Sequence, residues 1–174
     1  STVRFEFTGK SGIDTEIALR DARLARIVKA CQDLPGEELF QYLGDDGTQV
    51  DVNSTHVNLY LRELTGAAFT AKDFRTWGGT VIAAETLVEL GEPADEKEAE
   101  KHIITAIDAA AEKLGNTRAV CRSCYVHPAI PEAHVDGTLA AAWKASRDGA
   151  RCRRGERTVL KVLQAQAAED AKAA

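Results

Sequence analysis

The sequence LGNTRAVCRSCYVHP occupies residues 114–128 and places one tyrosine, Tyr125, near the end of a short polar-then-apolar segment. Asn116 or Thr117 can cap a short helix that runs through Tyr125, because either side chain can accept a hydrogen bond from a backbone N–H of the first turn. This stretch therefore predicts a tyrosine held by a short helix. Two prolines follow and are expected to terminate that helix: Pro128 and Pro131.

Helical patterns continue on both sides of this stretch. Leu24, Ile27 and Val28, for example, share one face of a predicted helix. Gly78 and Gly79 lie inside another, where each glycine weakens the helix by about 1 kcal/mol relative to alanine, so we expect close packing or a bend there. The predicted helices span residues 21–34, 37–43, 53–66, 70–90, 93–114, 116–125, 137–146 and 158–174.

The N-terminus alternates with a period of two instead. Apolar and polar residues alternate over residues 3–7, the turn-forming residues GKSG follow, and a weaker alternation covers residues 14–18. The simplest interpretation is a β-hairpin with Lys10 at its tip. We therefore predict a mainly α fold with a small N-terminal β-hairpin (α+β), in a single domain over residues 1–174 because no linker is long enough to divide it.

The composition is that of a protein with a buried core and no membrane span. The chain has 174 residues, of which 44% are hydrophobic, and no apolar run approaches the roughly 20 residues that cross a bilayer. It shows no signal peptide. It contains no methionine and begins within the alternating VRFEF pattern, so we expect that an upstream portion is missing.

The charge distribution bears on nucleic-acid binding. The net charge of −5 at pH 7 argues on its face against a DNA partner. Residues 85–113 hold nine acidic and three basic side chains, a net charge of −6, so the remainder carries +1. Basic groups outside this acidic window can therefore line a DNA groove. An ordinary acidic protein without a nucleic-acid partner is the alternative that charge alone leaves open.

A basic run lies near the C-terminus. It can neutralise DNA phosphates, each contact steepening the salt dependence of binding, or it can form a solvated segment without a partner. Its residues are Arg147, Arg151, Arg153, Arg154, Arg157 and Lys161.

Four cysteines in a chain of this size do not indicate a disulfide framework. Cys121 and Cys124 form a CxxC pair, and a zinc site would need two further ligands at suitable spacing. His127 and His134 follow the pair, so zinc stays an alternative. The preferred interpretation is two reduced thiols on a buried helix face.

Tyr125 is the candidate nucleophile. A tyrosine hydroxyl titrates near pH 10 in a model peptide, so it reacts only if its proton is removed or its phenolate is stabilised. Arg122 lies one helical turn earlier and can supply positive charge. Taken alone, the residue fits equally a tyrosine that packs its ring and hydrogen-bonds its hydroxyl.

Three stretches together resemble the catalytic domain of type IB DNA topoisomerases, particularly the bacterial, poxvirus-like branch. They are FTGKSG at 7–12, FTAKDFRTWGGT at 69–80 and the stretch at 114–128, within a resemblance that covers residues 3 to about 137. The resemblance implies the catalytic-domain fold shared by tyrosine recombinases and type IB topoisomerases. It also implies that Tyr125 attacks a phosphodiester and forms a 3′-phosphotyrosyl link, which needs neither ATP nor a metal.

The resemblance assigns the surrounding residues. Arg75, in a K-D-L/F-R-T motif, would stabilise charge on the phosphoryl oxygens through its planar fork of donors, with Lys72 and Arg122 as supporting DNA contacts. Asn116 stands where viral and eukaryotic enzymes place histidine. It can donate a hydrogen bond to a phosphoryl oxygen but cannot shuttle a proton, so its implied role is to stabilise the transition state. From the residues alone, Arg75 and Lys72 fit a solvated face, and Asn116 fits a helix cap.

Lys10 would be the general acid that protonates the 5′-oxygen leaving group, if nearby cations lower its pKa. The ordinary alternative is an exposed turn lysine. The GKS string lacks the spaced first glycine of a phosphate-binding P-loop, so nucleotide binding is set aside. Cys124 also departs from the family, which usually has serine or alanine before the tyrosine.

The family uses a second arginine upstream of the hairpin, and Arg4 is a poor substitute for it. The resemblance thus implies a missing upstream DNA-clamp domain, double-stranded DNA as partner, a monomer, and a location in the bacterial cytoplasm at the nucleoid. The nearest rival is a tyrosine recombinase, but such enzymes usually show H-x-x-R where this chain has Lys72 to Arg75. A non-catalytic DNA-binding or protein-interaction module on the same scaffold is the alternative from another class.

Overall fold

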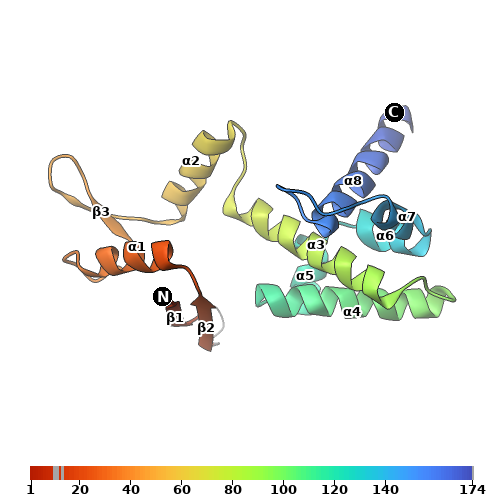
Figure 1. Cartoon of the computed structure of the whole chain (residues 1–174), viewed down its shortest axis with the longest axis horizontal. Coiled ribbons are helices and arrows are strands. Elements are labelled where there is room, and N and C mark those ends of the chain that lie inside the picture. Colours follow the sequence, from red (N-terminus) through yellow and green to blue (C-terminus); the bar gives the residue numbers. More distant parts are fainter. Residues whose placement is uncertain (10–11, 13, 174) are drawn as a thin grey trace. The chain divides into compact units, whose positions relative to one another are not determined.

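The computed structural model describes residues 1–9, 12 and 14–173 (Figure 1). Contacts within the chain divide it into two compact units, which we call the N-terminal unit, Ser1–Phe69, and the helical unit, Thr70–Ala174. Among the described residues, no helix combines the length and the apolar character needed to cross a membrane. The predicted fold class, mainly α with a small N-terminal hairpin, is confirmed.

The N-terminal unit opens with the predicted hairpin. Strand β1, Val3–Thr8, pairs antiparallel with β2, Asp14–Leu19, in a register that sets Val3 opposite Leu19 and Thr8 opposite Asp14. The Thr8 hydroxyl donates to a carboxylate oxygen of Asp14 at 2.9 Å and so joins the strands next to the turn. Lys10, predicted at the tip, lies outside the described residues.

Two capped helices follow in this unit. Helix α1, Ala22–Gln32, begins at Asp21, whose carboxylate accepts the N–H groups of Arg23 and Leu24 at 2.7 and 2.9 Å. Helix α2, Ser54–Thr65, begins at Asn53, which accepts two N–H groups of the first turn. Asn53 suits this position because its short side chain reaches those donors. No residue of α2 is buried.

The prediction of a helix over residues 37–43 is wrong. The segment bends and then forms strand β3, Gln41–Leu43, which pairs antiparallel with β4, Gln49–Asp51. The turn between them decides this outcome. A carboxylate oxygen of Asp46 accepts the Thr48 N–H at 2.9 Å, and Gly47 adopts a left-handed φ of 78°, so the loop reverses the chain and sheet pairing displaces helical spacing.

The helical unit contains the longest helices. Helices α3 and α4 pack against each other, and α8 packs against α3, α6 and α7 (Figure 1). Its elements are α3, Ala71–Leu90; α4, Glu96–Leu114; α5, Arg118–Cys124; α6, Ala129–Val135; α7, Thr138–Lys144; and α8, Arg154–Ala173.

The helix ends in this unit follow local chemistry, but two of the predicted ends need correction. Thr70 and Asp73 form a capping interaction at the start of α3, in which an Asp73 carboxylate oxygen accepts the Thr70 N–H and hydroxyl at 2.8 and 2.7 Å. The prediction that Pro131 terminates the tyrosine helix is wrong. Pro131 lies in the first turn of α6, where a missing N–H costs no intrahelical hydrogen bond. Helix α8 also begins earlier than predicted, within the basic run.

Part of that basic run closes helix α7. Arg154 lies over the Trp143 ring at 4.3 Å and donates to the Trp143 carbonyl at 2.8 Å. Arg147 donates to the Lys144 carbonyl at 2.6 Å, and Lys161 donates to the Ala145 carbonyl at 2.5 Å. Carbonyls at a helix C-terminus lack intrahelical partners and attract cations. These three side chains therefore have a structural role that neither sequence interpretation included.

The core of the helical unit supports a stability prediction. Leu87 of α3 is 1% exposed and belongs to a cluster with Ile107, Ile130 and Leu139. Leu87→Ala should lower the free energy of unfolding by about 3 kcal/mol, through lost burial and the cavity left behind. Chemical denaturation followed by tryptophan fluorescence measures this, because both tryptophans of the chain lie in the helical unit.

The matched control is Leu160→Ala on α8. Leu160 is 45% exposed, so its truncation should cost less than about 1 kcal/mol. Equal losses for the two variants would contradict a core centred on Leu87.

Candidate active site

Tyr125 lies immediately after helix α5. The Thr117 hydroxyl accepts the Val120 N–H at 3.3 Å at the start of this helix, and the Tyr125 N–H donates to the Cys121 carbonyl at 2.9 Å at its end. Thr117 is therefore the cap, of the two residues predicted for that role. The Tyr125 side chain is half-buried and packs against the core cluster, so its position is restrained.

Arg75 projects from α3 onto this tyrosine. Its guanidinium carbon lies 5.1 Å from the centroid of the Tyr125 ring, and its Nη2 donates to the Leu114 carbonyl at 2.7 Å. Leu114 is the last residue of α4, where carbonyls lack intrahelical partners. This hydrogen bond orients Arg75 and uses only part of its guanidinium, which has five N–H donors.

Asn116 meets the same carbonyl. Gly115 follows α4 with a left-handed φ of 64°, and the Asn116 N–H donates to the Ala111 carbonyl at 2.9 Å. This reversal directs the Asn116 amide nitrogen to the Leu114 carbonyl at 3.2 Å. Asn116 and Arg75 thus donate to the same carbonyl oxygen, and Arg75 also contacts the Tyr125 ring.

The two cysteines of the CxxC pair differ in environment. Cys121 is buried and Cys124 is exposed, so the predicted pair on a buried face is wrong for Cys124. Burial raises the pKa of the Cys121 thiol, and the positive charge of Arg75 opposes that shift. In the described part of the chain, no three or more His, Cys, Asp or Glu side chains come together as metal ligands.

Comparison with known proteins identifies the family to which this chain belongs. The sequence profile of the eukaryotic DNA topoisomerase I catalytic core matches residues 1–144. The chain belongs to the type IB DNA topoisomerase family. It is also 32% identical over 131 residues to the DNA topoisomerase 1B of Acanthamoeba polyphaga mimivirus. The matched region covers 71% of this chain and 39% of the viral protein, so the chain spans about two fifths of that relative's length.

The family match contains every site residue predicted from the sequence. Helix α8 and the whole of the basic run lie beyond residue 144, outside the matched type IB region. The three cations that bind carbonyls at the end of α7 therefore all come from the part of this chain that the family profile does not cover.

The supporting residues are less closely engaged. Lys72 is exposed in the first turn of α3. Arg122 is exposed in the last turn of α5, and it borders a groove of about 310 Å³ that Ile103, Val126 and Glu132 also line. Both side chains are cationic and exposed.

Two threonines of α3 were missed by the sequence analysis. The single Thr76 hydroxyl proton is shared between the Lys72 carbonyl at 3.2 Å and the Cys124 carbonyl at 3.3 Å. The Thr80 hydroxyl accepts the His127 N–H at 3.1 Å. The sequence carried one signal at this place, the Gly78-Gly79 pair inside a helical pattern, and close packing there is confirmed at Gly79.

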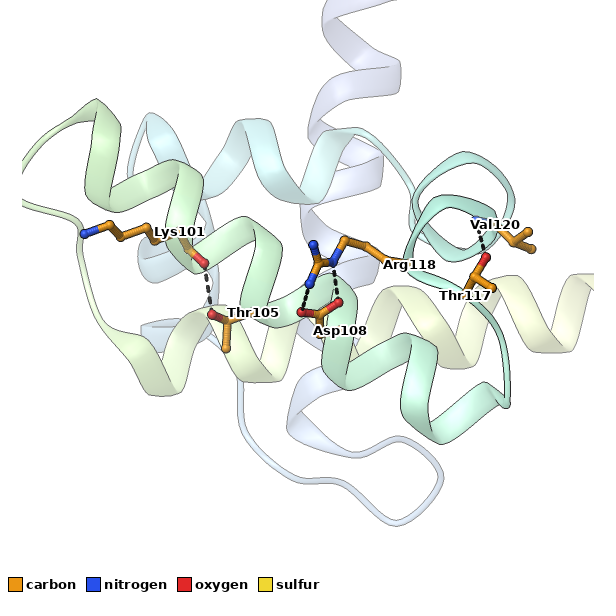
Figure 2. A network of polar contacts seen from close by, with 6 residues as sticks. All are labelled: Lys101, Thr105, Asp108, Thr117, Arg118 and Val120. Atoms are coloured by element: carbon orange, nitrogen blue, oxygen red, sulfur yellow. Dashed lines mark hydrogen bonds and ion pairs between the residues drawn. The ribbon is translucent and has the colours of Figure 1, made fainter. Parts of the chain in front are cut away.

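Arg118 joins the start of α5 to α4 (Figure 2). Its Nε and Nη2 donate to the two carboxylate oxygens of Asp108 at 2.5 and 2.6 Å. The charge pattern alone placed Asp108 in the acidic window without a partner. The pair links α4 to the helix that precedes Tyr125.

The same pair predicts a pH dependence of stability. Hydrogen bonding to Arg118 lowers the pKa of Asp108 below its ordinary value of 3.8. The stabilisation is therefore present above that ordinary pKa and is lost as the pH falls through the folded-state pKa. Asp108→Asn should lower the melting temperature slightly at pH 7, because exposed pairs contribute little, and should match the wild type in strong acid. Melting curves across this range would contradict the prediction if the difference did not change.

Proposed function

We propose that this chain is the catalytic part of a type IB DNA topoisomerase that relaxes supercoiled DNA through transient cleavage of one strand. The observation that carries the proposal is the placement of Arg75 over the Tyr125 ring, with Asn116 on the same Leu114 carbonyl. In-line attack on a phosphodiester is favoured when donors near the nucleophile stabilise charge on the phosphoryl oxygens, and Arg75 and Asn116 can supply such donors.

In the proposed cleavage step, the Tyr125 oxygen bonds to phosphorus as the bond from phosphorus to the 5′-oxygen breaks. The phenolic proton leaves to water, and Lys10 gives a proton to the departing 5′-oxygen. Arg75 and Asn116 stabilise the negative charge on the phosphoryl oxygens in the transition state. The 3′-phosphotyrosyl bond conserves the phosphodiester energy, so the 5′-hydroxyl can reseal the strand after rotation without ATP or metal.

Further parts of the proposal rest on the family resemblance. Lys72 and Arg122 contact DNA phosphates in support of the reaction. An upstream domain completes the clamp around the duplex, and the enzyme acts as a monomer at the nucleoid of a bacterial cell. The mimivirus relative supports the type IB assignment and leaves the bacterial source as part of this proposal.

The test uses supercoiled plasmid with EDTA and without ATP. Detergent added during the reaction should trap protein on nicked DNA, and nuclease and protease digestion should yield a nucleotide-linked peptide that contains Tyr125. Relaxation with that adduct supports the proposal in full. An adduct without relaxation supports cleavage but assigns strand rotation to the upstream clamp.

A chain that forms no adduct is tested again with its upstream region restored. A second failure overturns the proposed function and leaves a DNA-binding module without catalysis. Recombination between two duplexes, in place of relaxation, would instead identify the related strand transferase.

A further inference from the structure

The backbone on either side of Tyr125 is held by side chains of α3. Helix α5 ends at Cys124, so the carbonyls of its last turn have no partners within the helix. Thr76 and Thr80, one turn apart on α3, approach this region. The Thr76 hydroxyl lies 3.3 Å from the Cys124 carbonyl oxygen, and the Thr80 hydroxyl lies 3.4 Å from that of Tyr125.

Thr80 makes the stronger link on the C-terminal side. Its hydroxyl proton is shared between the Thr76 carbonyl at 2.7 Å and the Tyr125 carbonyl at 3.4 Å, and its oxygen accepts the His127 N–H at 3.1 Å. Thr80 is 2% exposed. His127 itself is exposed, and its N–H reaches an acceptor that belongs to a buried side chain. This hydrogen bond therefore attaches the chain after Tyr125 to α3.

Gly79 lets the two backbones approach. A Cβ at this position would lie 2.6 Å from the Tyr125 carbonyl oxygen and 3.3 Å from the Tyr125 Cβ. The first distance is shorter than carbon and oxygen atoms tolerate, so any larger residue must push Tyr125 away from α3. Glycine here therefore sets the separation between the tyrosine and the helix.

The same helix carries Arg75, whose guanidinium lies over the Tyr125 ring. We propose that Thr76, Gly79 and Thr80 are positioning residues that hold the Tyr125 backbone in register with Arg75. The inference rests on the proposed function, because the register matters only if Tyr125 attacks a phosphate that Arg75 binds. One rigid element then sets both the nucleophile and the charge that faces it, which is how small displacements come to affect a rate.

The test compares Thr80→Val with Thr80→Ser. Valine has nearly the shape of threonine but no hydroxyl, whereas serine keeps the hydroxyl. Single-turnover formation of the covalent adduct on a duplex oligonucleotide should slow by about 30-fold in Thr80→Val, within the range for a displacement of about 1 Å. Thr80→Ser should stay within about threefold of the wild type. Non-covalent DNA affinity, measured in a Tyr125→Phe background, should be unchanged in both.

A second readout does not depend on activity. The His127 amide should exchange with deuterium slowly in the wild type and in Thr80→Ser, and faster in Thr80→Val. If Thr80→Val does not fold, Thr76→Val at the half-buried neighbouring position replaces it and should slow adduct formation less.

The outcomes separate the two proposals. Equal adduct rates in the wild type and the valine variant, or equal exchange of the His127 amide, overturn the positioning role. A wild-type chain that forms no adduct even with its upstream region restored overturns the proposed function. In that case the exchange of the His127 amide still tests whether the Thr80 hydroxyl holds this N–H.

Discussion

Tyr125→Phe should form no detectable covalent adduct with DNA and should relax supercoiled plasmid at least about 10⁴-fold more slowly than the wild type. Loss of a catalytic nucleophile commonly costs this much or more. The substitution removes one oxygen and keeps the ring, so the packing against the core and the contact with Arg75 both remain. DNA affinity, measured by fluorescence anisotropy, should therefore be unchanged.

Tyr60→Phe is the matched control for the hydroxyl. Tyr60 lies on α2 in the N-terminal unit and is 61% exposed, so the loss of its hydroxyl should leave adduct formation unchanged. An adduct that persists in Tyr125→Phe would assign the nucleophile to another residue. Weaker DNA binding in that variant would mean that the hydroxyl serves recognition in place of chemistry.

The elements predicted correctly from the sequence are those set by local chemistry. Asn53 and Thr117 begin helices because their side chains reach N–H groups two or three residues ahead. The β1–β2 hairpin follows from alternation on two short segments around a glycine-rich turn. In each case the interacting groups are close in sequence, so the pattern contains the whole interaction.

The segment over residues 37–43 shows where local reasoning ends. Its spacing is compatible with a helix, yet Gln41 pairs with Asp51 across a turn and its side chain hydrogen-bonds that of Gln49. The preference for this pairing resides in the turn at Asp46 and Gly47, outside the segment itself. Weak helical spacing is overridden when a neighbouring turn brings a partner strand into place.

The candidate site was predictable as a set of residues and not as a geometry. The family motifs named Tyr125, Arg75 and Asn116, but they contain no sign of the shared Leu114 carbonyl. That contact joins residues 39 positions apart, and the link from His127 to Thr80 spans 47. Such contacts depend on how α3 packs against α4 and α5, which follows from the core.

Arg75→Ala should lower the rate constant of DNA cleavage by about 10³-fold, the lower part of the range for a transition-state arginine in phosphoryl transfer. The loss arises because the phosphoryl oxygens gain negative charge as Tyr125 attacks, and the Arg75 guanidinium lies over the Tyr125 ring. Single-turnover cleavage of a duplex oligonucleotide measures the rate constant directly.

Arg75→Lys separates charge from geometry at the same position. Lysine keeps the positive charge but lacks the planar fork that can bind the Leu114 carbonyl and a phosphoryl oxygen together. It should therefore recover less than about tenfold of the lost rate, and Arg62→Ala, which removes an exposed arginine of α2, should leave the rate unchanged. Full recovery with lysine would show that charge alone suffices. Equal losses in Arg62→Ala and Arg75→Ala would attribute the effect to net charge and remove the basis for placing Arg75 in the transition state.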